Sequence, residues 1–190
     1  MTEQTTISQS TTTFGESFFM ELENKAITPD IHSDHFTFED ADEELVEVSK
    51  FIMRHFPSKS ELELSRIKFL YADKPKKEGG KYGVGYIVPR TEIERAVDDR
   101  YDYIVCVYYH TWKNLDIKHK VIQLDKILCG VLVEFSTEGE KRVKKNVTDT
   151  REFKENIDNF GAEEVLNSSE IINLAVRTEV ERQKNIKKNG

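Results

Sequence analysis

Apolar residues in the first third of the chain recur at helical spacing. From Phe36 to Phe56 they occur every three or four residues, which predicts an amphipathic helix with one buried face. Asp40 stands at the position of an N-cap, and Pro57 begins the polar segment that ends the helix. The apolar face consists of Leu45, Val48, Phe51, Ile52 and Phe56.

Three short runs are typical of β-strands. Residues 66–71 and 82–88 alternate apolar and polar side chains, and the loop between them contains proline and glycine turn residues. Residues 102–109 are β-branched or aromatic almost throughout, which is the strongest strand pattern in the chain. We therefore expect a small sheet built from these three segments.

Helical patterns dominate the rest of the chain. Thr91 is expected to cap a short helix, with Glu94 at the capping-box position. Residues 116–133 are strongly helical, and the polar segment 134–147 is expected to form a loop or a hairpin.

Two more helices are predicted near the C-terminus. The first spans residues 149–160 and ends at Gly161, and the second spans residues 162–188. The order of a helix, several strands and then mostly helices indicates an α+β fold, in which a small mixed sheet packs against helices.

The 190 residues suffice for one domain with a core. We expect a disordered leader over residues 1–14, the α+β domain over 15–161 and a C-terminal helical extension over 162–190. The leader lacks the basic and apolar regions of a secretory signal, and no apolar run approaches the roughly 20 residues of a membrane helix. These features predict a cytoplasmic protein that does not enter a membrane.

The net charge of −7 is unevenly distributed along the chain. Residues 1–60 contain 12 acidic and 4 basic side chains, a balance of −8, whereas the remaining residues contain 23 and 24, a balance of +1. This acidic total argues against general nucleic-acid binding, which requires Lys and Arg to neutralise phosphates.

The densest acidic segment has two interpretations. It complements the dipole of the helix that it begins, or it forms an acidic patch that faces a basic partner. The candidate partner-binding residues in this segment are Glu39, Asp40, Asp42, Glu43 and Glu44.

A second candidate interface is the basic loop that precedes residue 82. It lacks the strand–glycine–lysine–helix order of a phosphate-binding loop, so it is either a solvated hairpin tip or a contact surface for a partner. Its lysines are Lys74, Lys76, Lys77 and Lys81.

The two cysteines, Cys106 and Cys129, both lie in apolar runs. Because no CxxC pattern accompanies them, we expect buried free thiols in a reducing compartment.

The helix predicted over residues 116–133 has apolar side chains on two sides, which indicates a helix buried between layers. One stripe contains Ile117, Val121, Leu124, Leu128 and Leu132, and the other contains Ile122, Cys129 and Val133.

Four phrases of the chain occur in the order seen in a known family. They are IKFLYADKPKKEGGK, DYIVCVYYHTW, LDIKHKVIQLDKILCGV and DTREFKENIDNFG. Their succession, from Glu43 to Gly161, is similar to the phage metallopeptidase family, a zincin-like group with a His-Glu-x-x-His helix. The resemblance implies a single zincin-like α+β domain. In that helix the two histidines bind zinc and the glutamate is the general base.

This sequence departs from the family pattern at each of the positions that would carry the chemistry. On the resemblance, the first histidine corresponds to Lys126, the glutamate to Ile127 and the second histidine to Gly130; a downstream ligand corresponds to Thr148. A lysine repels zinc, isoleucine accepts no proton, glycine has no side chain, and threonine is a poor zinc ligand. The resemblance therefore implies a protein with no bound metal, no other cofactor and no enzymatic activity.

The predicted function is that of a phage-encoded, catalytically inactive protein that inhibits or modulates a bacterial host protein. A defence system, a nuclease and the transcription machinery are all possible targets. Two alternatives stay open: an active metallohydrolase that uses a relocated site with His32, His35 or His110, and a virion or assembly protein. The sequence also leaves open whether the chain forms homo-oligomers.

Overall fold

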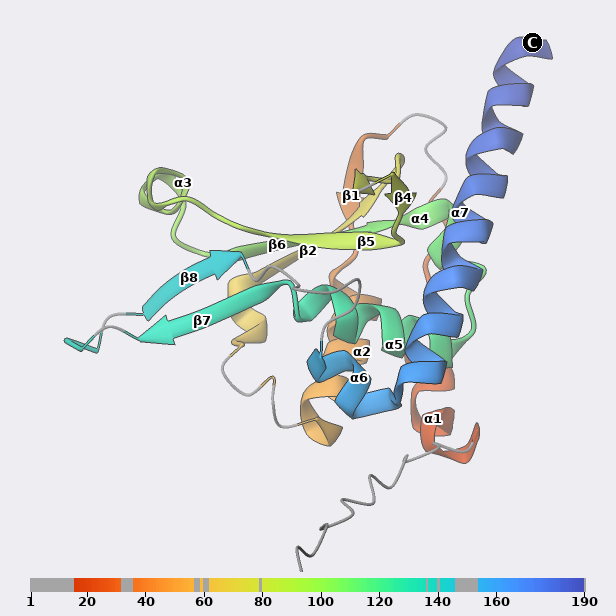
Figure 1. The fold of residues 1–190 in the computed structure, drawn as a ribbon. Helices are drawn as coiled ribbons and strands as arrows, with labels where there is room; N and C mark the ends of the chain where they lie inside the picture. The colour runs from red at the N-terminus through yellow and green to blue at the C-terminus, as the bar shows by residue number, and fades with distance from the viewer. Residues whose placement is uncertain are drawn as a thin grey trace, which may run out of the picture.

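Strand β6 (Tyr103–Tyr108) lies inside a four-stranded sheet with the order β1-β2-β6-β5 (Figure 1). β2 (Ile67–Ala72) pairs with β6 in parallel, and β5 (Gly85–Pro89) pairs with its other edge in antiparallel orientation. β1 (Phe38–Asp40) pairs antiparallel with β2. Five of the six β6 residues are buried, as expected for an inner strand covered on both faces.

The structure, a computed structural model, is a mixed α+β fold, which confirms the predicted fold class. It describes residues 16–31, 36–56, 59, 62–78, 80–135, 137–139, 141–145 and 154–189. The predicted leader, residues 1–14, lies outside the described residues.

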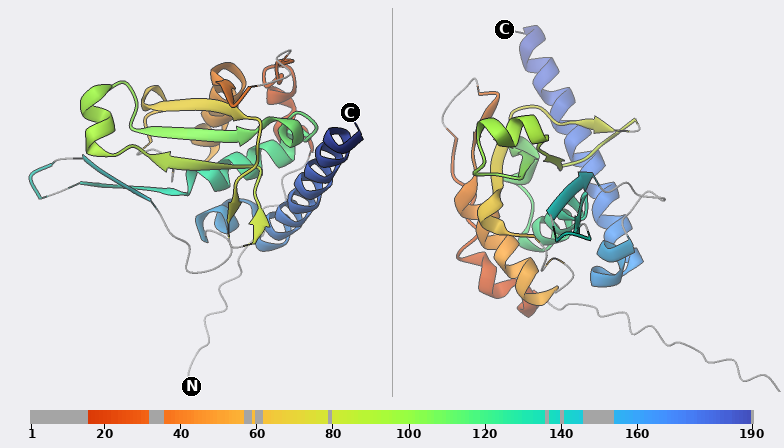
Figure 2. Two further views of the ribbon diagram at one scale, coloured as in Figure 1. Left: turned by 90° about the horizontal axis from the view of Figure 1, so that it is seen from above. Right: turned by 90° about the vertical axis from the view of Figure 1, so that its left-hand side faces the viewer.

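Three helices cover one face of the sheet (Figures 1 and 2). They are α1 (Glu16–Glu23), α2 (Asp42–His55) and α5 (Ile117–Leu128). The predicted apolar face of α2 is confirmed, because all five of its apolar side chains are buried in the core. No helix among the described residues is long and apolar enough to cross a membrane.

The two C-terminal helices lie beside this layer. α6 (Lys154–Phe160) ends at Gly161, whose φ of +85° provides the predicted left-handed stop. α7 (Ala162–Asn189) begins directly afterwards. It contributes Val165, Ile172 and Val176 to the same core, and its C-terminal part extends past the sheet (Figures 1 and 2).

Shorter elements connect these layers. Thr91 caps α3 (Glu92–Val97), and its capping box with Glu94 is confirmed. Other short elements are the 3-10 turn Leu64–Arg66, the hairpin β3 (Lys77–Glu78) and β4 (Lys81–Tyr82), and α4 (Tyr109–Trp112).

α5 is buried on nearly every side, as its two apolar stripes predicted. Every residue from Lys120 to Leu128 is buried except Lys126. The helix is capped by Asp116, whose side chain accepts a hydrogen bond from the His119 backbone nitrogen at 2.8 Å. The buried polar side chains of α5 therefore require hydrogen-bonding or oppositely charged groups within the protein, because burial removes most of their contact with water.

The prediction that this helix continues to residue 133 is wrong. α5 ends at Leu128, with Cys129 as its C-cap, and β7 (Val131–Phe135) forms a hairpin with β8 (Lys141–Lys145). The β-branched Val131 and Val133 favour the strand. The hairpin alternative predicted for the following polar segment is confirmed.

The prediction that Asp40 caps α2 is also wrong. Asp40 ends β1, where it pairs with Leu70, and Ala41 stands at the N-cap without a side-chain cap. The three-residue strand escaped prediction because its sequence, Phe-Glu-Asp, continues the acidic run and has no strand pattern. The two cysteines are buried free thiols, as predicted.

Gly85 allows β5 to approach α5 closely. A Cβ atom at this position would lie 2.6 Å from the Cys106 backbone oxygen and 2.7 Å from Ile127 Cδ1. We expect Gly85→Ala to lower the free energy of unfolding by about 1–3 kcal/mol through overpacking. The matched control is Gly83→Ala, whose nearest neighbour would be 3.5 Å away. Urea unfolding should show a change within about 0.5 kcal/mol for the control; equal effects would contradict this packing.

Candidate functional site

A buried lysine lies against the C-terminal end of α5. Lys59 is only 3% exposed, and its Nζ donates to Cys129 Sγ at 2.9 Å and to Glu155 Oε1. The same Nζ is 3.8 Å from Asp125 Oδ1. Asp125 and Cys129 are four residues apart, so one side of the end of α5 presents both to a single ammonium group.

Asparagine side chains of α6 complete the environment of the Asp125 carboxylate. Asn156 Nδ2 donates to Asp125 Oδ2 at 2.7 Å and to the Ile122 backbone oxygen at 3.2 Å. Asn159 Nδ2 lies 3.2 Å from both Asp125 oxygens. The carboxylate, which is fully buried, is therefore surrounded by donors from two segments of the chain.

Burial and charge determine the protonation of this cluster, which we call the Lys59 cluster (Lys59, Asp125, Cys129, Glu155, Asn156 and Asn159). Burial disfavours the Lys59 ammonium, but Asp125, Cys129 and Glu155 together raise the Lys59 pKa. Burial raises the pKa of Asp125, and Lys59 and the asparagines oppose that rise. Burial also raises the pKa of Cys129 to about 12, which keeps the thiol protonated at neutral pH.

A second buried charge lies near the first turn of α5. Glu44, which is 1% exposed, accepts hydrogen bonds from Lys120 Nζ at 2.7 Å, Trp112 Nε1 at 2.9 Å and Thr28 Oγ1 at 2.7 Å. The Tyr71 hydroxyl donates to the same carboxylate. The prediction that Glu44 belongs to an exposed partner-binding surface is therefore wrong, because its carboxylate is buried and hydrogen-bonded within the core.

The positions predicted for the zinc helix do not form one site. Lys126 is half-buried and donates to Ser169 Oγ on α7 at 3.0 Å, and Ile127 is buried. Gly130 lies beyond the end of α5, where an added Cβ would meet Ile87 Cγ2 at 2.7 Å. The two positions that correspond to the histidines of the family motif therefore do not lie on one helix, because α5 ends at Leu128.

Thr148, His32 and His35 lie outside the described residues. His110 Nε2 is 2.9 Å from Asp73 Oδ1. In the part of the chain that the structure describes, no group of three or more His, Cys, Asp or Glu side chains is arranged to hold a metal ion.

The remaining acidic candidates lie around the start of α2. Glu39 is half-buried, Asp40 is exposed and pairs with Lys68, and Glu43 is exposed. The backbone of Asp42 begins the helix, and its side chain lies outside what the structure describes.

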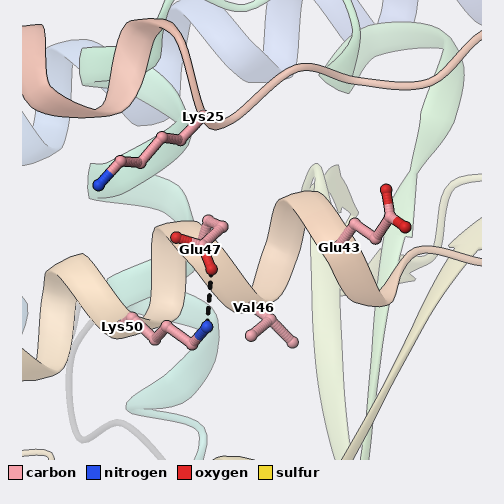
Figure 3. Close-up of a pocket in the computed structure, with 5 residues that line it drawn as sticks. All are labelled: Lys25, Glu43, Val46, Glu47 and Lys50. Atoms are coloured by element: carbon pink, nitrogen blue, oxygen red, sulfur yellow. Dashed lines mark hydrogen bonds and ion pairs between the residues drawn. The ribbon is translucent and has the colours of Figure 1, made fainter.

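Glu43 borders a shallow hollow between α1 and α2, together with Lys25, Val46, Glu47 and Lys50 (Figure 3). Lys50 and Glu47 form an ion pair at 2.7 Å there. The hollow offers paired surface charges and no arrangement of a nucleophile and a base.

The basic loop forms the β3–β4 hairpin and keeps its four lysines on the surface. The ammonium of Lys76 is 4.6 Å from the centre of the Tyr86 ring, and that of Lys77 is 5.4 Å from the centre of the Tyr82 ring. These contacts restrict the positions of two of the four ammonium groups.

The residues of the Lys59 cluster do not fit a zinc ion. Zinc sites in proteins use three or four ligands at about 2.0–2.3 Å, and a cysteine ligand has to be a thiolate. Here Asp125 and Cys129 have the four-residue spacing of two ligands, but an ammonium occupies the position between them and the Cys129 pKa is about 12.

Sequence reasoning missed this cluster. The available signal was the pair Asp125 and Cys129, two ligand-type residues four apart on a helix predicted to be buried. Lys59 carried no such signal, because it belongs to a polar segment that was expected only to end a helix.

Removal of the Lys59 ammonium should leave the Asp125 charge buried without its cation. We expect Lys59→Met to lower the free energy of unfolding by about 3–5 kcal/mol at neutral pH. Addition of Asp125→Asn should recover part of that loss, because it removes the uncompensated charge. Chemical denaturation of both variants measures the effect. A loss below about 1 kcal/mol, or a double variant less stable than the single one, would contradict the pairing.

Comparisons with known proteins identify the family. Residues 36–179 match the family model described as "Putative phage metallopeptidase". No curated protein and no solved structure gives a significant match. The matched region includes the sheet, the whole of α5 and the first part of α7, and it continues past Gly161, where the sequence resemblance was expected to end. Because the match covers most of the sequence, this chain belongs to the phage metallopeptidase family.

Proposed function

We propose that this chain is a catalytically inactive member of its family and that it inhibits or modulates a protein of the bacterial host by binding it. The observation that carries the proposal is the Lys59 ammonium, which is buried between Asp125 and Cys129 on the helix that would carry the chemistry. The two parts of the proposal, loss of catalysis and binding to a host protein, rest on different features.

Loss of catalysis follows from the residues around the ammonium. In a zinc-peptidase helix, two ligands four apart flank a general base that directly follows the first ligand. The pair that faces a cation here is Asp125 and Cys129. They lie one residue before the two ligand positions that the family resemblance assigned, residues 126 and 130. In this register the base position falls on Lys126, which donates to Ser169 and accepts no proton as an ammonium.

The Lys59 cluster also opposes metal entry. A zinc ion would add two positive charges beside an ammonium that is already buried, and it would require ionisation of a thiol with a pKa of about 12. It would also have to displace the hydrogen bonds from Lys59 to Cys129 and Glu155. The Lys59 ammonium, which is covalently attached to the chain, therefore takes the place of a zinc ion, which could dissociate.

Binding to a host protein is supported by the exposed charges. The β3–β4 hairpin carries four exposed lysines, two of them over tyrosine rings. The occupant that suits this surface is an acidic face of a partner. An inhibitor that acts by binding needs an exposed surface of this kind and no catalytic group. The Lys59 cluster is consistent with such a role, because the Lys59 side chain occupies the space of a metal ion.

Metal content and activity test the loss of catalysis. We expect the untagged protein, incubated with zinc and then dialysed, to contain no stoichiometric zinc by elemental mass spectrometry. A chelator should leave its melting temperature unchanged, and unstructured protein substrates should stay intact. Retention of one zinc per chain together with zinc-dependent peptide hydrolysis would overturn this part of the proposal.

Capture from a bacterial lysate tests the binding surface. We expect wild-type protein to retain a host protein that Lys76→Glu/Lys77→Glu fails to retain, because the reversed charges repel an acidic face. The matched control is Lys25→Glu/Lys50→Glu, which reverses two lysines beside the hollow between α1 and α2. Equal capture by the hairpin variant and the wild type would refute a role for the hairpin.

A further inference from the structure

Among the side chains of α7 that the structure describes, those that face away from the core are accessible along the helix. At 1.5 Å per residue the 28 residues of α7 span about 42 Å. Val165, Ile172 and Val176 face the core, whereas Leu174 lies on the opposite side and is 67% exposed. Leu166 and Ile171 lie on its two flanks at 43% and 42% exposure, so this side of the helix exposes three large apolar side chains.

The net charge on this side, which we call the outer face of α7, changes sign along the helix. Glu163 and Glu170 lie before Leu174, and Arg177, Glu181, Lys184 and Lys188 lie after it, all of them exposed. Successive members of this set, from Glu163 to Lys188, are seven, four, three, four, three and four residues apart, so they follow one line along the helix. The outer face therefore has an acidic half, an apolar centre and a half that is basic on balance, because its three cations outnumber the one carboxylate of Glu181.

We propose that the outer face of α7 binds the same face of a second copy of this chain, with the two helices antiparallel. With the two-fold axis beside Leu174, Glu170 of one copy faces Arg177 of the other, and Glu163 faces Lys184. The pattern is self-complementary only in this orientation, because a parallel pair would place like charges opposite each other. Self-complementary patches of this kind produce closed two-fold dimers.

The shape of the molecule permits this pairing. The C-terminal part of α7 extends past the sheet, so the acidic half of a partner helix, which is joined to its own core, has room beside it (Figures 1 and 2). The interface uses residues that the Lys59 cluster and the β3–β4 hairpin do not contain. The dimer is therefore independent of the function proposed above.

Charge exchange tests the pairing in the purified protein. We expect sedimentation velocity to show a monomer–dimer equilibrium for the wild type over micromolar concentrations. Glu170→Lys alone and Arg177→Glu alone should each weaken dimerisation by about tenfold or more, because each places like charges opposite each other. An equimolar mixture of these two variants should recover the dimer, since each then opposes its complement, and so should the double variant.

Two further variants complete the experiment. Leu174→Asp should abolish the dimer, whereas Ile93→Asp, at an exposed apolar position on α3, should leave it unchanged. Thermal melting of all variants verifies that the fold is intact. The proposal would be overturned by a wild type that is monomeric at every concentration. It would also be overturned if Glu170→Lys and Arg177→Glu each dimerised as strongly as the wild type.

Discussion

The requirement that buried charges be paired governs the centre of this protein. α5 passes through the core with Lys120 near one end and Asp125 near the other, both buried. An unpaired charge in such a position would cost several kcal/mol. Lys120 is paired with Glu44 of α2, and Asp125 with Lys59 and two amides of α6. These pairs fix the positions of α2, α6 and the Lys59 segment around α5.

The Lys59 pair links the architecture to the proposed function. A zinc peptidase holds a cation at the same kind of helix and uses it to activate water, so the cation must remain open to ligands. An ammonium surrounded by Cys129, Glu155 and Asp125 provides positive charge to the core but no open coordination position. In the proposed function, the exposed surfaces of this fold are what remains for interaction with a partner.

The sequence predicted those features that depend on neighbouring residues. The β6 strand, the Thr91 capping box and the stop at Gly161 each follow from a few adjacent side chains. The contacts of the Lys59 cluster were beyond such reasoning, because Lys59 and Cys129 are 70 positions apart. Glu44 shows the same limit. Its acidic neighbours suggested a surface, whereas Trp112, Lys120 and Tyr71 from distant segments bury it.

The most direct test of the account is a crystal structure of the protein grown with zinc and measured at the zinc absorption edge. The account predicts no anomalous peak beside Cys129, with Lys59 Nζ in hydrogen-bond contact with Cys129 Sγ. A strong peak at about 2.3 Å from Cys129 Sγ, the length of a zinc–sulfur bond, would contradict it. In that case Lys59 would have to point elsewhere, and the protein would be a metalloprotein.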